Sequence, residues 1–227
     1  MKLPFSQPEF FGVFAAYNTA VWPFQLVLVG LAVAVVWLAV RPRRWSNRFA
    51  SWVLAFFWIW MGLVYHFVFF RAINPAAGVF AAAFVLEGVL IGVVGGAQGR
   101  LDCRVQPTWR GIAGALVIAY ALVGYPALAL LLGHQFPATA TFGLPCPTTI
   151  FTLGVLLWLR QPAPVSLLII PAAWSLIGTS AALQLGVRED LGLVVAGVAT
   201  AVLRFVPWAG LPAGWPAGAS ASLWTGS

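Results

Sequence analysis

The sequence predicts an all-α integral membrane protein, a helical bundle of about seven transmembrane helices with an N-terminal interfacial helix. Of its 227 residues, 62% are apolar and only 7% are charged, which is more apolar surface than a soluble domain can bury. Apolar runs of roughly 20 residues, the length that crosses about 30 Å of hydrocarbon, recur along the chain. The arginines lie in short segments between these runs rather than on one basic face, which argues against nucleic acid as a partner.

The individual elements follow from helical spacing and from helix-terminating residues. Phenylalanines at helical spacing over residues 8–18 predict a short helix at the membrane interface. Asn74 as N-cap and Pro75 in the first turn begin the third crossing, in which Gly88, Gly92 and Gly96 recur every four residues and allow a neighbouring helix to approach closely. The predicted crossings are residues 22–40, 49–70, 75–96, 111–132, 146–160, 165–185 and 191–205.

The distribution of lysine and arginine predicts the orientation of the bundle. With the amino terminus outside, the cytoplasmic loops contain Arg41, Arg43, Arg44, Arg48, Arg100, Arg104, Arg110, Arg160 and Arg204, and the outer side contains Lys2, Arg71 and Arg188. Nine cations inside against three outside agree with the positive-inside rule. Residues 1–206 are therefore predicted to form one transmembrane domain, and the Gly/Pro/Ala/Ser-rich residues 207–227 a disordered tail.

The fifth crossing is the irregular one. From Pro147 to Arg160 there are only 14 residues, about 21 Å of helix at 1.5 Å per residue, which is less than the hydrocarbon thickness. We expect the preceding stretch, "GHQFPATATFGLPCP", to enter the protein, so that the helix begins inside the bundle, as in transporters with broken helices. Cys146, Thr148 or Thr149 could cap that helix; the alternative is that prolines and threonines merely start a helix and Cys146 packs as a small apolar residue.

Rare polar residues gather on the predicted outer side and suggest a vestibule there. His66 and His134 are the only histidines of the chain, and both map to the outer ends of crossings. The predicted substrate-binding residues are Cys146, His134, His66, Thr148, Thr149 and Asn18. In the alternative interpretation, each histidine is a hydrogen-bonded or solvated residue without a site, and Asn18 packs or caps a helix end.

Two cofactor chemistries are compatible with this set. Imidazole and thiolate ligands suit a soft metal ion, so Cys146, His134 and His66 are a candidate metal site, although their spacing matches no known metal signature. His66 and His134 could instead ligate a haem between two helices, which would make the protein a haem- or cofactor-binding membrane redox protein. The sequence identifies no cofactor.

Glu87 is the carboxylate that lies deepest in a predicted crossing. It follows Pro75 by 12 residues and therefore lies near mid-membrane, where an ionisable group is a functional candidate by default. Tyr120 lies at comparable depth in the fourth crossing, so Glu87 and Tyr120 are the candidate proton-coupling residues of a carrier. The alternative is a neutral Glu87 that hydrogen-bonds one neighbour and fixes helix packing.

Several motifs resemble an uncharacterised bacterial multi-pass membrane-protein family, described only as a domain of unknown function. These motifs are "AAYNTAVWPFQ", "GLVYHFVFFRAINPAA" and "GHQFPATATFGLPCPTTIFTLG", and the resemblance covers most of the chain through the fifth crossing. It implies a protein of the bacterial cytoplasmic membrane and no assigned activity.

Other functional classes lack their residues. The only lysine is Lys2, which excludes a retinal Schiff base in the last helix, and neither "HExxH" nor "GxSxG" occurs. No enzyme class is therefore indicated. We expect a transporter or binding protein for a small solute or soft metal ion with an outward-facing site; the lipid bilayer is its one clear partner, and the oligomeric state is not indicated.

Overall fold

The computed structural model describes residues 3–205, and within them the chain is a bundle of helices without β-strands. The α-helices are α1 (Gln7–Val21), α2 (Phe24–Val40), α3 (Ser46–Trp60), α4 (Ala77–Ile91), α5 (Trp109–Ala119), α6 (Tyr125–Leu131), α7 (Pro145–Leu157), α8 (Ile169–Leu185) and α9 (Leu191–Phe205). Short π- and 3₁₀-helical segments extend or precede several of them: η1 (Met61–Phe69), η2 (Phe70–Ala72), η3 (Gly92–Ala97), η4 (Tyr120–Gly124), η5 (Val165–Leu167) and η6 (Arg188–Asp190).

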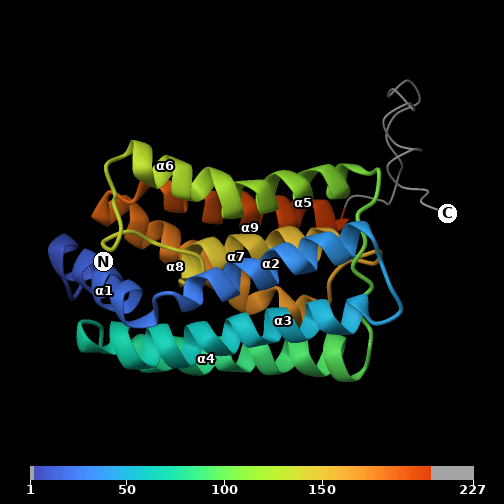
Figure 1. The fold of residues 1–227 in the computed structure, drawn as a ribbon, viewed down its shortest axis with the longest axis horizontal. Helices are drawn as coiled ribbons and strands as arrows, with labels where there is room; N and C mark the ends of the chain where they lie inside the picture. Colours follow the sequence, from blue (N-terminus) through green and yellow to red (C-terminus); the bar gives the residue numbers. More distant parts are fainter. Residues whose placement is uncertain (1–2, 206–227) are drawn as a thin grey trace.

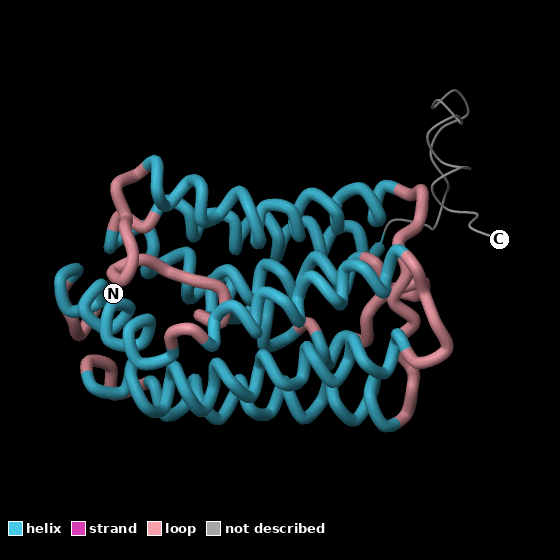
Figure 2. Tube along the Cα trace, viewed as in Figure 1, coloured by secondary structure: helices cyan, strands magenta, loops and turns pink. Residues whose placement is uncertain are grey.

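The helices run along one long axis, with α1 across one end (Figure 1). The pair α3 and α4 forms one side of the bundle, α5, α6 and α9 form the other, and α7 lies between them. In Figure 2 the loops gather at the two ends, except for the segment before α7, which runs from one end into the middle. From α2 onwards the chain direction alternates between successive helices, except that α6 continues the direction of α5 through η4 (Figure 1).

The amino-terminal helix is anchored at both of its ends. Ser6 and Glu9 form a capping box at its start, and Gln7 Nε2 donates a 2.7 Å hydrogen bond to the Leu185 carbonyl at the end of α8. At its other end α1 meets α2 at 87° around Trp22 and Pro23. The predicted interfacial helix is therefore present and lies across the bundle rather than along it.

Glycines set the two closest helix crossings. A Cβ at Gly88 would lie 2.7 Å from the Ala55 carbonyl oxygen of α3, so the predicted glycine row does bring α3 and α4 together. At the second crossing, a Cβ at Gly154 of α7 would lie 3.1 Å from the Gly114 oxygen of α5 and 2.7 Å from Ile118 Cγ1. Both contacts require glycine, because a side chain at Gly88 or Gly154 would clash with the neighbouring helix.

Helix α7 is the centre of the fold, because all 13 of its residues are buried. Before it, Phe142 packs edge to face on Phe57 and Phe151 at centroid distances of 5.3 and 5.4 Å. Gly143 adopts a φ of 100°, which lets the chain turn into Leu144 and Pro145. The segment "GHQFPATATFGLPCP" therefore enters the bundle and α7 begins inside it, as the short fifth crossing predicted.

Four helical stretches are long and apolar enough to cross a membrane among the described residues: 46–72, 77–97, 109–131 and 165–185. The bent pair α1 and α2 raises this number to five if it counts as one span. The predicted positions agree closely with observed helices, but α7 and α9, with 13 and 15 residues, fall below that length. The predicted tail, 207–227, lies outside the described residues.

Candidate functional site

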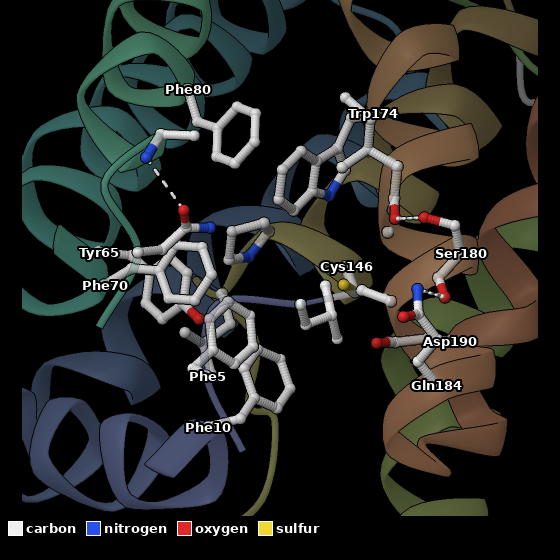
Figure 3. A pocket seen from close by; sticks show the side chains of 18 of the residues that line it. Phe5, Phe10, Tyr65, Phe70, Phe80, Cys146, Trp174, Ser180, Gln184 and Asp190 are labelled. Atoms are coloured by element: carbon white, nitrogen blue, oxygen red, sulfur yellow. Dashed lines mark hydrogen bonds between the residues drawn. The ribbon is translucent and has the colours of Figure 1, made fainter. Parts of the chain in front are cut away.

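The described bundle contains a cavity of about 760 Å³ beneath α1. Pockets for small ligands have volumes of roughly 300–1,000 Å³, so this one is large enough for a drug-sized molecule. Figure 3 shows it between the helices of the α3–α4 side and α8. Its walls are mostly apolar: Leu3, Pro4, Phe5, Phe10, Phe14, Tyr65, Phe70, Asn74, Pro75, Ala76, Phe80, Ala140, Leu144, Pro145, Cys146, Trp174, Leu176, Ile177, Gly178, Ser180, Ala181, Gln184 and Asp190.

Asp190 is the one charged residue among those that line the cavity. It ends η6, is 2% exposed, and lies with Cys146 across the cavity from Phe5, Phe10, Tyr65 and Phe70 (Figure 3). Its carboxylate accepts a 2.5 Å hydrogen bond from the Tyr125 hydroxyl of α6 and interacts with the Cys146 thiol. Two helices thus hold the carboxylate at the cavity wall.

The pKa of Asp190 is raised from its ordinary value to about 7. Burial is the main cause, because it disfavours the charged form, and the neighbouring carboxylate of Glu189 acts in the same direction. The hydrogen bonds from Tyr125 and Cys146 and the nearby His134 oppose the shift. Asp190 can therefore gain or lose a proton near neutral pH.

A second carboxylate adjoins Asp190. Glu189 is 1% exposed; its Oε1 lies 2.7 Å from Nδ1 of His134, and its Oε2 has no hydrogen-bond partner among the described residues. The Tyr120 hydroxyl donates to the Glu189 backbone carbonyl at 2.6 Å. His134 thus belongs to the polar cluster of η6 and is paired there with a carboxylate.

Asn18 has a different role from the predicted one. Its Nδ2 donates to the carbonyls of Pro137 and Thr139, both at 2.7 Å, and its Oδ1 accepts from Thr141 and Gln25. Asn18 is fully buried and does not line the cavity. It holds the loop that enters the bundle, and this loop in turn positions the start of α7.

The threonines of α7 do not cap the helix. No side chain caps α7; instead Thr148 Oγ1 accepts from the Gly143 backbone N–H at 2.9 Å and closes the preceding turn. Pro145 and Pro147 lack N–H groups, so two of the donors that a cap would satisfy do not exist. Thr149 is fully buried with an unpartnered hydroxyl, and neither threonine lines the cavity.

His66 lies behind the cavity wall rather than in it. Its ring packs against Phe84 at 4.5 Å and Trp174 at 5.0 Å between centroids, and neither ring nitrogen has a hydrogen-bond partner among the described residues. Its ring contacts share no residue with those of His134, which touches Phe11 and Glu189. The structure brings Cys146 and His134 to adjacent carboxylates and leaves His66 apart.

This placement bears on both cofactor interpretations. No group of three or more His, Cys, Asp and Glu residues is arranged to hold a metal ion in the part of the chain that is described, so Cys146, His134 and His66 do not form one. Neither histidine lines the cavity, so the cavity does not bring them together as haem ligands.

Glu87 and Tyr120 lie in separate places. Glu87 is fully buried in α4, and neither carboxylate oxygen has a hydrogen-bond partner among the described residues. Tyr120 belongs to the opposite side of the bundle, where it bonds to η6 (Figure 1). The structure therefore does not join them as a coupling pair, and Glu87 is not bonded to one neighbour as the packing interpretation requires.

Sequence reasoning missed Asp190, Tyr125 and Trp174. A signal for the first existed, because Glu189 and Asp190 are adjacent in a chain with only five acidic residues, immediately before a predicted crossing. Nothing in the sequence marks Trp174 among 12 tryptophans.

The comparisons with known proteins identify the family and nothing further. No curated protein and no solved structure matches the chain. The profile of a family of unknown function, DUF6064, matches residues 7–208, which is most of the sequence. The chain therefore belongs to the family of unknown function DUF6064.

Proposed function

We propose that the protein is an integral protein of the bacterial cytoplasmic membrane that binds a small, largely apolar molecule in the cavity beneath α1, as a carrier or a receptor would. In this arrangement α2 to α9 make seven crossings with the amino terminus outside. The short α7 and α9 complete their crossings with the loops at their ends.

The surface of the bundle supports membrane insertion. Large apolar side chains project outward from α5, η4 and α6, with Leu116 66%, Val123 68% and Leu130 65% exposed. A row of this kind is costly in water and favourable in lipid. The loops between α2 and α3, between α4 and α5 and between α7 and α8, which contain most of the arginines, lie together at the end opposite α1, which suits a cytoplasmic face (Figure 1).

The observation that carries the binding proposal is the cavity itself. It is large, mostly apolar and closed on one side by the aromatic rings of Phe5, Phe10 and Phe70, which contact one another at 5.4–6.1 Å. A cavity of this size in a well-packed bundle is unfavourable unless something fills it. Few polar groups line it, so the complementary ligand is apolar over most of its surface.

The mouth of the cavity indicates how such a ligand enters. Leu176 and Ile177 of α8 line the cavity and are also 69% and 42% exposed, so the cavity reaches the surface of the helix that would face lipid. Ala76, just before α4, and Phe80 of α4 line the other side. A ligand dissolved in the outer leaflet could therefore enter between α4 and α8.

Protection of Cys146 tests this proposal, because Cys146 is one of two cysteines and the only one that lines the cavity. With Cys103 replaced by serine, the protein is placed in phosphatidylcholine nanodiscs and the rate of Cys146 modification by N-ethylmaleimide is measured by mass spectrometry. The uncharged probe (4,4-dimethylpentyl)benzene should slow the reaction severalfold and saturably.

A matched pair of variants locates the protection. Ala181→Phe fills the cavity and should abolish the effect of the probe, whereas Ala115→Phe places the same side chain on the exposed face of α5 and should preserve it. The proposed site would be refuted if the probe did not slow the modification of Cys146 saturably at any concentration. It would also be refuted if the protection survived Ala181→Phe.

A further inference from the structure

The electrostatics of the cavity restrict its ligand further than its apolar walls do. Of the residues that line it, one carries a charge, and that charge is negative at Asp190. Among residues 3–205, which the structure describes, no lysine, arginine or histidine lines it. An anionic ligand would therefore meet a carboxylate without any compensating cation, which is costly in a buried site.

The carboxylate has no cationic partner of its own in the described part of the chain. The ion pairs of that part join Asp102 to Arg104 and Arg160, and His134 to Glu189, but none includes Asp190. His134 can neutralise only one of the two adjacent carboxylates. The Tyr125 hydroxyl and the Cys146 thiol donate hydrogen bonds to Asp190 and bring no charge.

The opposite wall suits a cation as well. Tyr65 and Phe70 stack at 5.5 Å between centroids, and Phe5 meets Phe70 edge to face at 5.4 Å. These rings and Trp174 surround the space in front of Asp190 (Figure 3). Aromatic faces attract ammonium groups, most strongly where water is excluded.

We propose that the ligand of this cavity is a hydrophobic monocation, such as an amine or quaternary ammonium compound, whose charge pairs with Asp190 while its apolar part fills the rest of the cavity. This inference rests on the proposed function, because it names the class of molecule that the same cavity binds. Asp190 is the counterion, and the rings of Tyr65, Phe70 and Trp174 form the remaining surface for the charged group.

The same protection experiment tests the charge with three probes of one shape. Trimethyl(3-phenylpropyl)ammonium is the cation, (4,4-dimethylpentyl)benzene replaces its nitrogen by carbon, and 3-phenylpropylsulfonate is an anion of similar size.

In Asp190→Asn the concentration of cation that gives half-protection should rise roughly tenfold to a hundredfold, the range expected for loss of one charged contact. The value for the uncharged probe should stay within about twofold, which also shows that the variant is folded. As a matched control, Asp102→Asn removes a carboxylate from the arginine-rich end and should change neither value.

The wild-type protein gives a second test that needs no substitution at the site. The sulfonate should fail to protect Cys146 at ten times the concentration at which the ammonium probe does, a difference of the size expected for one charged contact. Equal protection by cation and anion, or a cation affinity unchanged by Asp190→Asn, would overturn the inference while the proposed function stands. Failure of all three probes to protect would overturn both.

Discussion

Titration of Asp190 should make the stability of the protein fall between pH 4 and pH 7. In the folded protein the pKa of this carboxyl is raised to about 7, chiefly by burial, whereas an unfolded chain has the ordinary value near 3.9. Between these values the folded state retains a proton that the unfolded state has released. Stability therefore decreases as pH rises through this window, and the stabilising contribution of the protonated Asp190 carboxyl is fully present below the lower pKa.

The size of the effect follows from the shift. Each pKa unit corresponds to about 1.36 kcal/mol, so a shift of about three units costs the folded protein about 4 kcal/mol at pH 8 relative to pH 4. This is a large share of the roughly 5–15 kcal/mol by which folded domains are stable. An asparagine at this position can still accept a hydrogen bond from Tyr125, but it cannot ionise.

The assay is the free energy of unfolding in lipid bicelles, measured by steric trapping from pH 4 to pH 8 in the wild type and in Asp190→Asn. The wild-type value should fall by about 4 kcal/mol more than that of the variant, because asparagine at position 190 cannot ionise. Asp102→Asn is the control. Burial raises the pKa of Asp102, but its contacts with Asn47, Arg104 and Arg160 outweigh burial, and the pKa is lowered overall. Asp102 therefore titrates below the window in which Asp190 titrates. Parallel curves for wild type and Asp190→Asn would refute the reasoning.

Three further substitutions test the packing around the site, each by the same unfolding measurement. Gly154→Ala should destabilise the protein by about 1–3 kcal/mol because the new Cβ would meet Ile118 and the backbone of Gly114. Gly30→Ala should stabilise the protein by up to about 1 kcal/mol, because a Cβ there has nothing within 4 Å and alanine favours the helix. Equal effects of the two substitutions would contradict the observed crossing of α5 and α7. Asn18→Ala should cost about 1–3 kcal/mol, since two carbonyls of the loop before α7 lose their donor, and a loss below about 0.5 kcal/mol would show that the loop is held otherwise. Glu87→Leu should raise stability by about 1 kcal/mol or more, because it removes a buried carboxyl without a partner; a large loss would reveal a partner that the fold does not show.

Local sequence signals predict the helices of this protein well. The predicted crossing at residues 191–205 coincides with α9, and that at 165–185 coincides with η5 and α8 together. These ends are marked by proline, glycine or charge, and the apolar runs between them are long. The unusual α7 was also predictable, because the distance from Pro147 to Arg160 is too short for an ordinary crossing.

The site was only half predictable, because side-chain partners depend on how distant helices pack. Cys146 and His134 were recognised as rare residues at the outer end, but their partners Asp190 and Glu189 come from a loop more than 40 residues later. Depth along a helix suggested Glu87 and Tyr120 as a pair, yet depth does not specify the direction in which a side chain points. His66 illustrates the same limit, since it lies near the cavity but faces Phe84 and Trp174.

The cavity and the short helix are two consequences of one sequence feature. Helix α7 has 13 residues, about 20 Å, so a crossing of about 30 Å leaves about 10 Å of the bundle centre without a helix. A helix about 10 Å in diameter would fill roughly 800 Å³ over that length, a volume of the same order as the 760 Å³ cavity. The loop held by Asn18 occupies part of the space. The prolines at 145 and 147 thus begin α7 late, place Cys146 at the edge of the resulting space, and leave Asp190 facing a cavity rather than a helix.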